Sequence, residues 1–208
     1  MILSKKKKLV KKIKDYEVLI FDLDNTIYNS NTYEYEVFKI ITRYLNKKTK
    51  IKKQKIFNFL KLKRKKEVLS NVSLNIFNLL LKNNKNKNKY IKECIRIFQN
   101  YKLKKINHKK TLYSELKMLK KKNKEMYLVT NGNYNRQLNK IKALKILKFF
   151  NMIYILEKKS KQKPSLSGVK TLKKIKKNKK SIIIEDSKIN KKFALKLSVD
   201  YKRFINDF

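Results

Sequence analysis

Five short apolar runs occur along the chain, separated by segments in which apolar residues recur at helical spacing. The runs cover residues 18–21, 126–129, 152–156, 181–184 and, as the weakest of the five, 199–204. Short apolar runs bounded by polar residues are typical of buried strands, and strands that alternate with helices build a parallel sheet with helices on both faces. The pattern therefore predicts an α/β fold with a Rossmann-like parallel sheet.

The alternation is interrupted between residues 32 and 105. Four segments in this stretch place apolar residues at helical spacing, and no strand-like run separates them. Four helices inserted after the first strand indicate an all-α cap over the carboxyl end of that strand. We therefore predict an α/β core formed by residues 1–31 and 106–208 and a helical cap formed by residues 32–105. Within the cap, the polar tract of residues 82–89 predicts a loop.

Two carboxylates follow the first apolar run. In the sequence LIFDLDNT, Asp22 ends the run and Asp24 stands two residues further on. Side chains two apart on a strand share a face, so we expect Asp22 and Asp24 to lie together at the carboxyl end of the strand. Open α/β sheets bind their ligands at that end. The pair is therefore the first candidate for a functional site.

The chain is strongly basic, with 58 lysine and arginine residues against 15 aspartate and glutamate residues and a formal charge of +43. Such a charge is compatible with nucleic-acid binding. However, lysine, asparagine and isoleucine, which have AT-rich codons, are abundant, whereas there are only two glycines, one proline and five arginines. Compositional drift in an AT-biased genome explains much of this charge, and the lysines lie on nearly every predicted helix. We therefore expect no specific nucleic-acid partner.

Other features of the composition concern the compartment of the protein. The single cysteine, Cys94, excludes an internal disulfide framework, and its helical spacing from Ile91 and Phe98 indicates buried packing. No apolar run approaches the roughly 20 residues of a membrane span, and the basic N-terminal segment lacks the apolar stretch of a signal peptide. We expect a cytoplasmic protein without a membrane partner. Its N-terminal segment is expected to be an amphipathic surface helix or a frayed tail, with a transit peptide as the less favoured alternative.

Four sequence motifs fall in an order that is found in one enzyme family. DLDNT at residues 22–26 places two aspartates around one residue before a threonine, and VTNG at residues 129–132 follows a predicted strand. QKP at residues 162–164 contains a lysine before the only proline, and IIIEDS at residues 182–187 places two acids at the end of another strand. In this combination the chain resembles the haloacid dehalogenase-like phosphohydrolases over nearly its whole length.

The resemblance implies a role for each motif. Asp22 would attack phosphorus and form an aspartyl-phosphate intermediate, and Asp24 would protonate the leaving oxygen and then activate the hydrolytic water. Thr130 and the backbone N–H of Asn131 would bind the phosphoryl oxygens. Lys163 would balance the charges of Asp22 and the phosphate.

The resemblance also implies a Mg²⁺ cofactor, because a carboxylate attacks a dianionic phosphomonoester only when a cation neutralises both groups. The Asp22 side chain, the backbone carbonyl of Asp24 and the Asp186 side chain are the expected ligands. Glu185 is expected either to be a second acidic ligand beside Asp186 or to support it. Many relatives have glycine where this chain has Glu185, so the fourth motif matches the variants with two adjacent acids followed by serine.

Other functions remain compatible with the sequence. A dehalogenase of the same fold is disfavoured, because that chemistry does not use the acid at Asp24. A phosphomutase could share the Glu-Asp-Ser form of the fourth motif, and a non-catalytic RNA- or polyanion-binding protein would make use of the charge. The form DLDNTIY resembles the pyrimidine 5′-nucleotidase branch, which favours a nucleoside 5′-monophosphate among the small phosphorylated metabolites.

For three tyrosines and the single histidine the sequence gives less specific predictions. The tyrosines Tyr28, Tyr33 and Tyr35 follow the first motif, and we expect them either to line the substrate cavity or to pack in the core. His108 is the only histidine. Because the expected chemistry needs no imidazole, we interpret His108 as a hinge or surface residue near the return from cap to core.

Overall fold

The structure is a computed structural model that describes residues 8–70, 75–104, 106, 111–175, 179–186 and 191–204. In these parts of the chain the helices are α1 (Lys8–Lys12), α2 (Asn31–Thr49), α3 (Lys53–Ser70), α4 (Ile76–Leu80), α5 (Lys87–Asn100), α6 (Tyr113–Lys121), α7 (Tyr134–Ala143), α8 (Lys170–Ile175) and α9 (Lys191–Leu197). The strands are β1 (Val18–Phe21), β2 (Glu125–Asn131), β3 (Met152–Leu156), β4 (Ser181–Glu185) and β5 (Asp200–Arg203). Short 3-10 helices occur at Leu147–Phe149, Lys159–Lys161 and Ser167–Val169.

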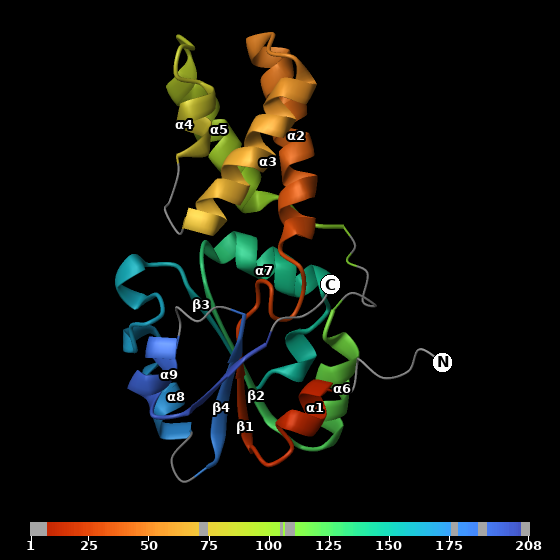
Figure 1. Ribbon diagram of the computed structural model, residues 1–208, viewed down its shortest axis with the longest axis vertical. Coiled ribbons are helices and arrows are strands. Elements are labelled where there is room, and N and C mark those ends of the chain that lie inside the picture. Colours follow the sequence, from red (N-terminus) through yellow and green to blue (C-terminus); the bar gives the residue numbers. More distant parts are fainter. Residues whose placement is uncertain are drawn as a thin grey trace. The chain divides into compact units, whose positions relative to one another are not determined.

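The strands form one parallel sheet in the order β3-β2-β1-β4-β5 (Figure 1). The central strand β1 pairs in parallel with β2 on one side and with β4 on the other. All residues of β1 are buried, as expected for a parallel sheet that is covered on both faces. In Figure 1, α8 and α9 lie on one side of the sheet, and α1 and α6 lie on the other. The predicted α/β fold is therefore confirmed.

Alternation of the side chains along β1 divides the core into two layers. On one face, Val18 and Ile20 belong to an apolar cluster that also contains residues of β2, β4, α8 and α9, among them Phe193. On the opposite face, Leu19 and Phe21 are fully buried as well. Because both faces of β1 are packed, the strand is fixed in place and so is the start of the segment that follows Phe21.

The basic N-terminal segment contributes a helix to the same unit. Within α1, Leu9 and Val10 are buried, and Ile13 just after the helix is also buried. The Glu115 carboxyl of α6 accepts a hydrogen bond from the backbone of Val10. Backbone N–H groups in the first turn of a helix have no partner within that helix, so this bond joins α1 to α6. Within the described residues, α1 is therefore an amphipathic helix whose apolar side is packed.

The chain divides into two compact units, one formed by Met1–Ser30 with Lys104–Phe208 and the other by Asn31–Leu103. The second unit contains α2, α3, α4 and α5. One face of α2 is buried at helical spacing by Tyr33, Val37, Phe38, Ile41, Thr42 and Leu45. The assignment of this helical unit as a cap stays a prediction.

The loop predicted within the helical unit is present at residues 82–86 but ends three residues early. The tract of residues 82–89 was expected to be a loop, but α5 begins at Lys87, so the last three residues of the tract are helical. Lysine is a good helix former, and the buried Cys94 anchors the helix that follows. The polar composition of the tract therefore did not mark the start of the helix.

Two further predictions concern the environment of Cys94 and membrane-spanning helices. Cys94 is fully buried, as predicted, and burial raises the pKa of its thiol to about 12. A thiol with such a pKa is a packing group and a poor nucleophile at neutral pH. No helix in the described parts of the chain is long and apolar enough to cross a membrane.

Candidate active site

The candidate residues gather at the carboxyl end of β1. Asp22 follows this strand directly, and its N–H donates to the carbonyl oxygen of Ile184 at 3.1 Å, which continues the pairing with β4. The chain runs from β1 to β2 and β3 on one side of the sheet and then to β4 and β5 on the other. The switch in direction therefore lies between β1 and β4, where open α/β sheets bind ligands. Asp22 and Asp186 follow these two strands.

The turn after Asp24 has a conformation that suits its sequence. Asn25 adopts φ = 58°, in the left-handed region that asparagine enters more readily than most residues. Its side-chain Oδ1 accepts hydrogen bonds from the N–H and the hydroxyl of Ser30 at 3.1 and 2.8 Å. Leu23 and Ile27 on either side are fully buried. The turn is therefore fixed by packing and by a local hydrogen-bonded loop.

Lys163 is in direct contact with the predicted nucleophile. Its ammonium lies 2.8 Å from Oδ1 of Asp22 and also contacts Oε1 of Glu185. The Lys163 side chain is only 1% exposed, in contrast to most lysines of this chain. The loop that carries it is tied to the end of β2, because the backbone N–H of Lys163 donates to Oδ1 of Asn131 at 2.9 Å. Asn131 therefore positions Lys163 through its side chain.

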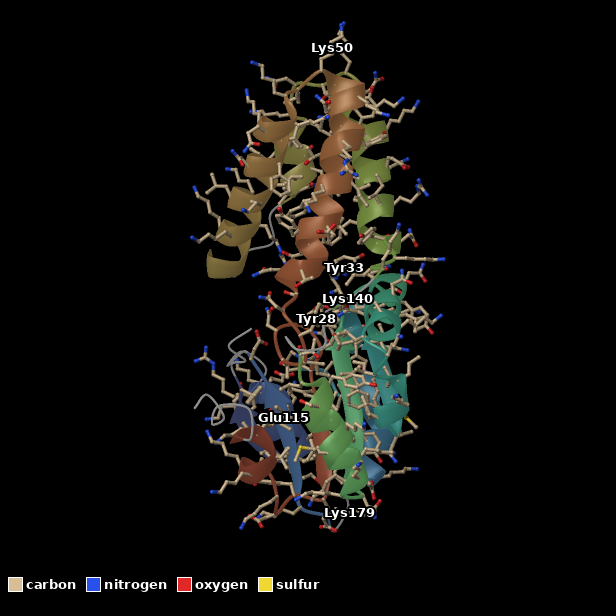
Figure 2. All side chains as sticks on the ribbon, turned by 90° about the vertical axis from the view of Figure 1, so that its right-hand side faces the viewer. Tyr28, Tyr33, Lys50, Glu115, Lys140 and Lys179 are labelled. Atoms are coloured by element: carbon tan, nitrogen blue, oxygen red, sulfur yellow. The ribbon has the colours of Figure 1, made fainter. Side chains whose placement is uncertain are left out.

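Within the described parts of the chain, the carboxylate of Asp24 has four hydrogen-bonding contacts. Lys140 on α7 lies 2.8 and 2.9 Å from its two oxygens, Tyr28 donates to Oδ1 at 2.9 Å and Gln137 donates to Oδ2 at 3.1 Å. Figure 2 shows Tyr28 and Lys140 close together in the α/β unit. Burial by itself would raise the pKa of Asp24, but Lys140, Gln137 and Tyr28 outweigh this effect and lower the pKa. Asp24 is therefore ionised in this arrangement.

The other acidic groups differ from Asp24 in their electrostatics. Burial raises the pKa of Asp22, and the nearby Lys163 ammonium opposes this rise without cancelling it. Burial and the charge of Asp22 raise the pKa of Asp186. Burial alone would lower the pKa of Lys163, but Asp22 and Glu185 raise it well above its usual range. Lys163 therefore stays charged, whereas the ionised forms of Asp22 and Asp186 are disfavoured relative to free carboxylates.

Thr130 occupies the end of β2 and is 1% exposed. Its hydroxyl oxygen accepts a hydrogen bond from the Gln137 amide at 2.7 Å. A threonine hydroxyl has one proton to donate, and the bond from Gln137 uses an acceptor site only. The Thr130 proton is thus available to a phosphoryl oxygen, as the predicted role requires.

The residues around Asp22 fit a bound Mg²⁺ ion. Asp22 and Asp186 are the carboxyl groups whose pKa values are raised, so a cation beside them would stabilise their ionised forms. The side chains of Glu185 and Asp24 are each engaged by a buried lysine. Among the described residues no three His, Cys, Asp or Glu side chains cluster so that they could hold a metal ion by themselves. Mg²⁺ does not require this, because one or two carboxylates with carbonyl, water and phosphate oxygens are its usual ligands.

The structure brings the predicted residues of all four motifs to the same end of the sheet. Asp22 and Asp24 follow β1, Thr130 and Asn131 end β2, Lys163 follows β3, and Glu185 and Asp186 stand at the end of β4. Their catalytic, phosphate-binding and metal-binding roles stay predictions. Ser187, the last residue of the fourth motif, and His108 lie outside the described residues.

Sequence reasoning missed Gln137 and Lys140. Both are buried on α7 together with Ile141, although glutamine and lysine usually lie at the surface. The missed signal was their position, because residues 137, 140, 141 and 144 form one helical face that otherwise consists of Ile141 and Leu144. Polar residues at two positions of an otherwise apolar helical face indicate that each has a buried hydrogen-bonding partner.

The tyrosines of the first motif separate into different environments. Tyr28 is fully buried and contacts Asp24. Tyr33 is fully buried in the helical unit, where its hydroxyl donates to the carbonyl oxygen of Phe98 at 2.6 Å. Tyr35 is 44% exposed and packs edge-on against Phe57. Core packing therefore accounts for Tyr33, and Tyr28 joins the candidate site.

Comparison with known families identifies the class of the protein. Residues 19–202 match the family described as haloacid dehalogenase-like hydrolase, so the match includes all four motifs. The chain therefore belongs to the haloacid dehalogenase-like hydrolase family and is an enzyme. A search of curated proteins gives no match.

Solved structures of other proteins have the same fold. The magnesium-bound HAD-hydrolase YfnB from Bacillus subtilis is similar with a TM-score of 0.66 and 16% identity over 93% of this chain and 88% of that chain. A HAD-superfamily hydrolase of subfamily IA from Geobacter sulfurreducens gives a TM-score of 0.62 and 10% identity over 93% and 89%. A protein assigned as a β-phosphoglucomutase from Thermotoga maritima gives 0.51 and 16% over 92% and 88%. At these identities the similarity concerns the fold.

Proposed function

We propose that this hydrolase is a Mg²⁺-dependent phosphomonoesterase that acts on a small phosphorylated metabolite through an aspartyl-phosphate intermediate. The observation that carries the proposal is the buried Lys163 ammonium, which contacts Asp22 and Glu185 at the switch point of the sheet. A fixed cation beside a carboxylate stabilises the charge that develops when the carboxylate attacks a phosphate.

In the first step an oxygen of Asp22 attacks phosphorus, and the bond from phosphorus to the ester oxygen breaks. Because Asp24 is ionised in the free enzyme, it first takes up a proton from solvent, and it then gives this proton to the leaving alcohol. Thr130 donates its hydroxyl proton to a phosphoryl oxygen, and Lys163 balances the negative charge. The products are the free alcohol and a phosphorylated Asp22.

In the second step water hydrolyses the aspartyl phosphate. Asp24, now ionised, takes a proton from the attacking water, phosphate leaves, and the Asp22 carboxylate is regenerated. The low pKa of Asp24, which Lys140, Gln137 and Tyr28 cause, supports the base role in this step. The same group serves both steps because the proton lost in the first is regained in the second.

The Asp22 and Asp186 carboxylates and the backbone carbonyl of Asp24 would hold the Mg²⁺ ion. When bound, Mg²⁺ would supply the positive charge that brings a carboxylate and a dianionic phosphate together. The pairing of Glu185 with Lys163 supports a role for Glu185 in positioning this lysine, in preference to its alternative role as a ligand.

Nucleoside 5′-monophosphates are the substrates that we favour. The support comes from the DLDNTIY motif, with Asn25 in the position where many relatives have glycine. We further propose that the helical unit Asn31–Leu103 acts as the cap that selects the substrate. Sugar phosphates and phosphoglycolate are the competing substrates.

The test is phosphate release from a panel of nucleoside monophosphates, sugar phosphates, phosphoglycolate and p-nitrophenyl phosphate with Mg²⁺. We expect turnover of at least one natural monoester, with the highest kcat/KM for a nucleoside 5′-monophosphate. Absence of phosphate release from the whole panel would contradict the proposed activity. A preference for sugar phosphates would overturn the substrate assignment alone.

A phosphomutase is the second candidate. In that reaction the phosphoryl group passes from Asp22 to a hydroxyl group of the substrate and not to water. The Glu185-Asp186 pair of the fourth motif, which several phosphomutases share, supports this alternative. Conversion of a sugar monophosphate into its positional isomer with a catalytic amount of the bisphosphate would establish it.

A further inference from the structure

The face of α7 that points into the α/β unit carries two polar side chains one helical turn apart. Gln137 is fully buried, and Lys140 is 4% exposed. Burial of a lysine is costly unless its charge is paired and hydrogen-bonded. Both oxygens of Asp24 provide that pairing at 2.8 and 2.9 Å. The position of Lys140 is thereby coupled to the position of the Asp24 carboxylate.

Gln137 connects Asp24 to the phosphate-binding end of β2. Its amide nitrogen lies 3.1 Å from Oδ2 of Asp24, 2.7 Å from the Thr130 hydroxyl and 3.1 Å from the carbonyl oxygen of Asn131. This nitrogen therefore contacts both the Asp24 carboxylate and the Thr130 hydroxyl. A shift of Gln137 would therefore change the separation of Asp24 and Thr130.

The contacts of Asp24 also restrict how its carboxylate can rotate. Each oxygen of an ionised carboxylate can accept about two hydrogen bonds. Oδ1 accepts from Lys140 and Tyr28, and Oδ2 accepts from Lys140 and Gln137. With donors on both oxygens, rotation of the carboxylate breaks several bonds at once. Its orientation is therefore fixed by α7 and Tyr28.

We propose that Gln137 and Lys140 are positioning residues that hold the Asp24 carboxylate and the Thr130 hydroxyl at a fixed separation. This inference rests on the proposed phosphomonoesterase function. The two residues act through their neighbours, since proton transfer belongs to Asp24 and phosphoryl binding to Thr130. Substitution of either residue should therefore slow protonation of the leaving group more than it slows the attack of Asp22 on phosphorus.

The dependence of the rate on the leaving group tests this proposal. The nitrophenolate of p-nitrophenyl phosphate departs without a proton, whereas the alkoxide of a primary alkyl phosphate requires one. General acid catalysis typically contributes about 10²–10⁴-fold. We expect Lys140→Met to lower kcat/KM about 10²-fold or more for the alkyl phosphate and less than about 10-fold for p-nitrophenyl phosphate. The value of kcat/KM depends only on the steps up to and including departure of the alcohol. The later hydrolysis of the aspartyl phosphate therefore does not affect it.

Two further variants separate positioning from charge and from folding. Gln137→Met keeps the volume and the Asp24–Lys140 ion pair, and we expect it to lower the ratio of alkyl to nitrophenyl activity by about 10-fold. Lys140→Arg keeps a cation that can bind a carboxylate, so it should restore most of this ratio. Lys142→Met is the matched control, because Lys142 lies exposed on the same helix, and it should leave both activities unchanged.

Folding of each variant is checked by circular dichroism and thermal unfolding. An unchanged ratio in folded Lys140→Met and Gln137→Met would overturn the positioning proposal, as would equal losses on both substrates. If the wild-type enzyme hydrolyses neither substrate with Mg²⁺, the proposed function fails first. The two failures are therefore distinguishable.

Discussion

The ammonium of Lys163 lies 2.8 Å from Oδ1 of Asp22 and also contacts Glu185, so one buried cation joins the ends of β1 and β4. This relationship places the predicted nucleophile at the switch point of the sheet with its counter-charge already in position. Charges that are fixed before the reaction need no reorganisation during it. The predictions that follow test the roles of the groups around this contact and the stability of the unit that carries them.

The role of Asp22 as the nucleophile is tested by Asp22→Asn. We expect turnover to fall below detection, because the amide cannot attack phosphorus, while Lys163 keeps Glu185 as a partner and the fold is retained. Acid quenching with radiolabelled substrate should trap protein-bound phosphate in the wild type and none in the variant. Appreciable Mg²⁺-dependent turnover by the folded variant would contradict the assignment.

The metal requirement is tested by chelation. EDTA should abolish phosphate release, Mg²⁺ should restore it, and Ca²⁺ should restore it poorly. Calcium accepts more ligands at longer distances, so it would misalign the attacking carboxylate and the phosphate. Full activity in excess chelator would exclude the proposed mechanism.

The different roles of Glu185 and Asp186 are tested by Glu185→Gln and Asp186→Asn. We expect Asp186→Asn to raise the Mg²⁺ concentration for half-maximal activity by about 10-fold or more, because it removes a proposed ligand. Glu185→Gln should lower kcat about 10-fold or more by loosening Lys163, with little change in the Mg²⁺ dependence. A large shift in the Mg²⁺ dependence of Glu185→Gln would instead identify Glu185 as a ligand.

The stability of the α/β unit should depend on pH through Glu115, which Figure 2 labels. Burial raises the pKa of this carboxyl from 4.5 to about 7, while a hydrogen bond from the backbone of Val10 opposes the rise. Its Oε2 has no hydrogen-bond partner among the described residues. Between pH 4.5 and about 7 the unfolded chain loses this proton before the folded chain does. Stability should therefore be highest below this window and should fall as the pH rises through it.

Glu115→Gln should remove this pH dependence, because the amide is neutral throughout and its oxygen can still accept from the backbone of Val10. Above pH 7 the variant should be more stable by up to about 3 kcal/mol. The measurement is urea unfolding at several pH values, with the exposed Glu157→Gln as the control. Equal pH dependence of the wild type and Glu115→Gln would contradict the prediction.

The high charge of the chain should have little effect on catalysis. Figure 2 shows nitrogen-tipped side chains that project from helices of both units, as expected if the lysines are spread over the surface. RNA should therefore bind weakly and without sequence preference, and it should dissociate as salt rises from about 50 to about 300 mM. Turnover should persist over this range, because Asp22 and Lys163 act at contact distance in a buried site. Tight, sequence-selective RNA binding across the range would overturn the drift explanation.

The sequence by itself determined the fold class and the positions of the main acids. Strands are recognised by short apolar runs, and the chain has few glycines or prolines that would break the pattern. The placement of Asp22 and Asp24 follows from their position directly after β1, since a residue that ends a central parallel strand has a known location in the sheet. The order of the four motifs along the chain indicated which further groups would join this site.

Only the tertiary structure decided that Lys140 belongs to the site. Among 58 basic residues, residue type carries almost no information about function. Lys163 could be selected from its proline neighbour, but the partner of Lys140 is Asp24, which is 116 residues away in sequence. Burial depends on how α7 packs on the sheet, and that packing is a non-local property. The sequence thus located the carboxylates and Lys163, whereas the folded chain alone determined that Lys140 neutralises Asp24.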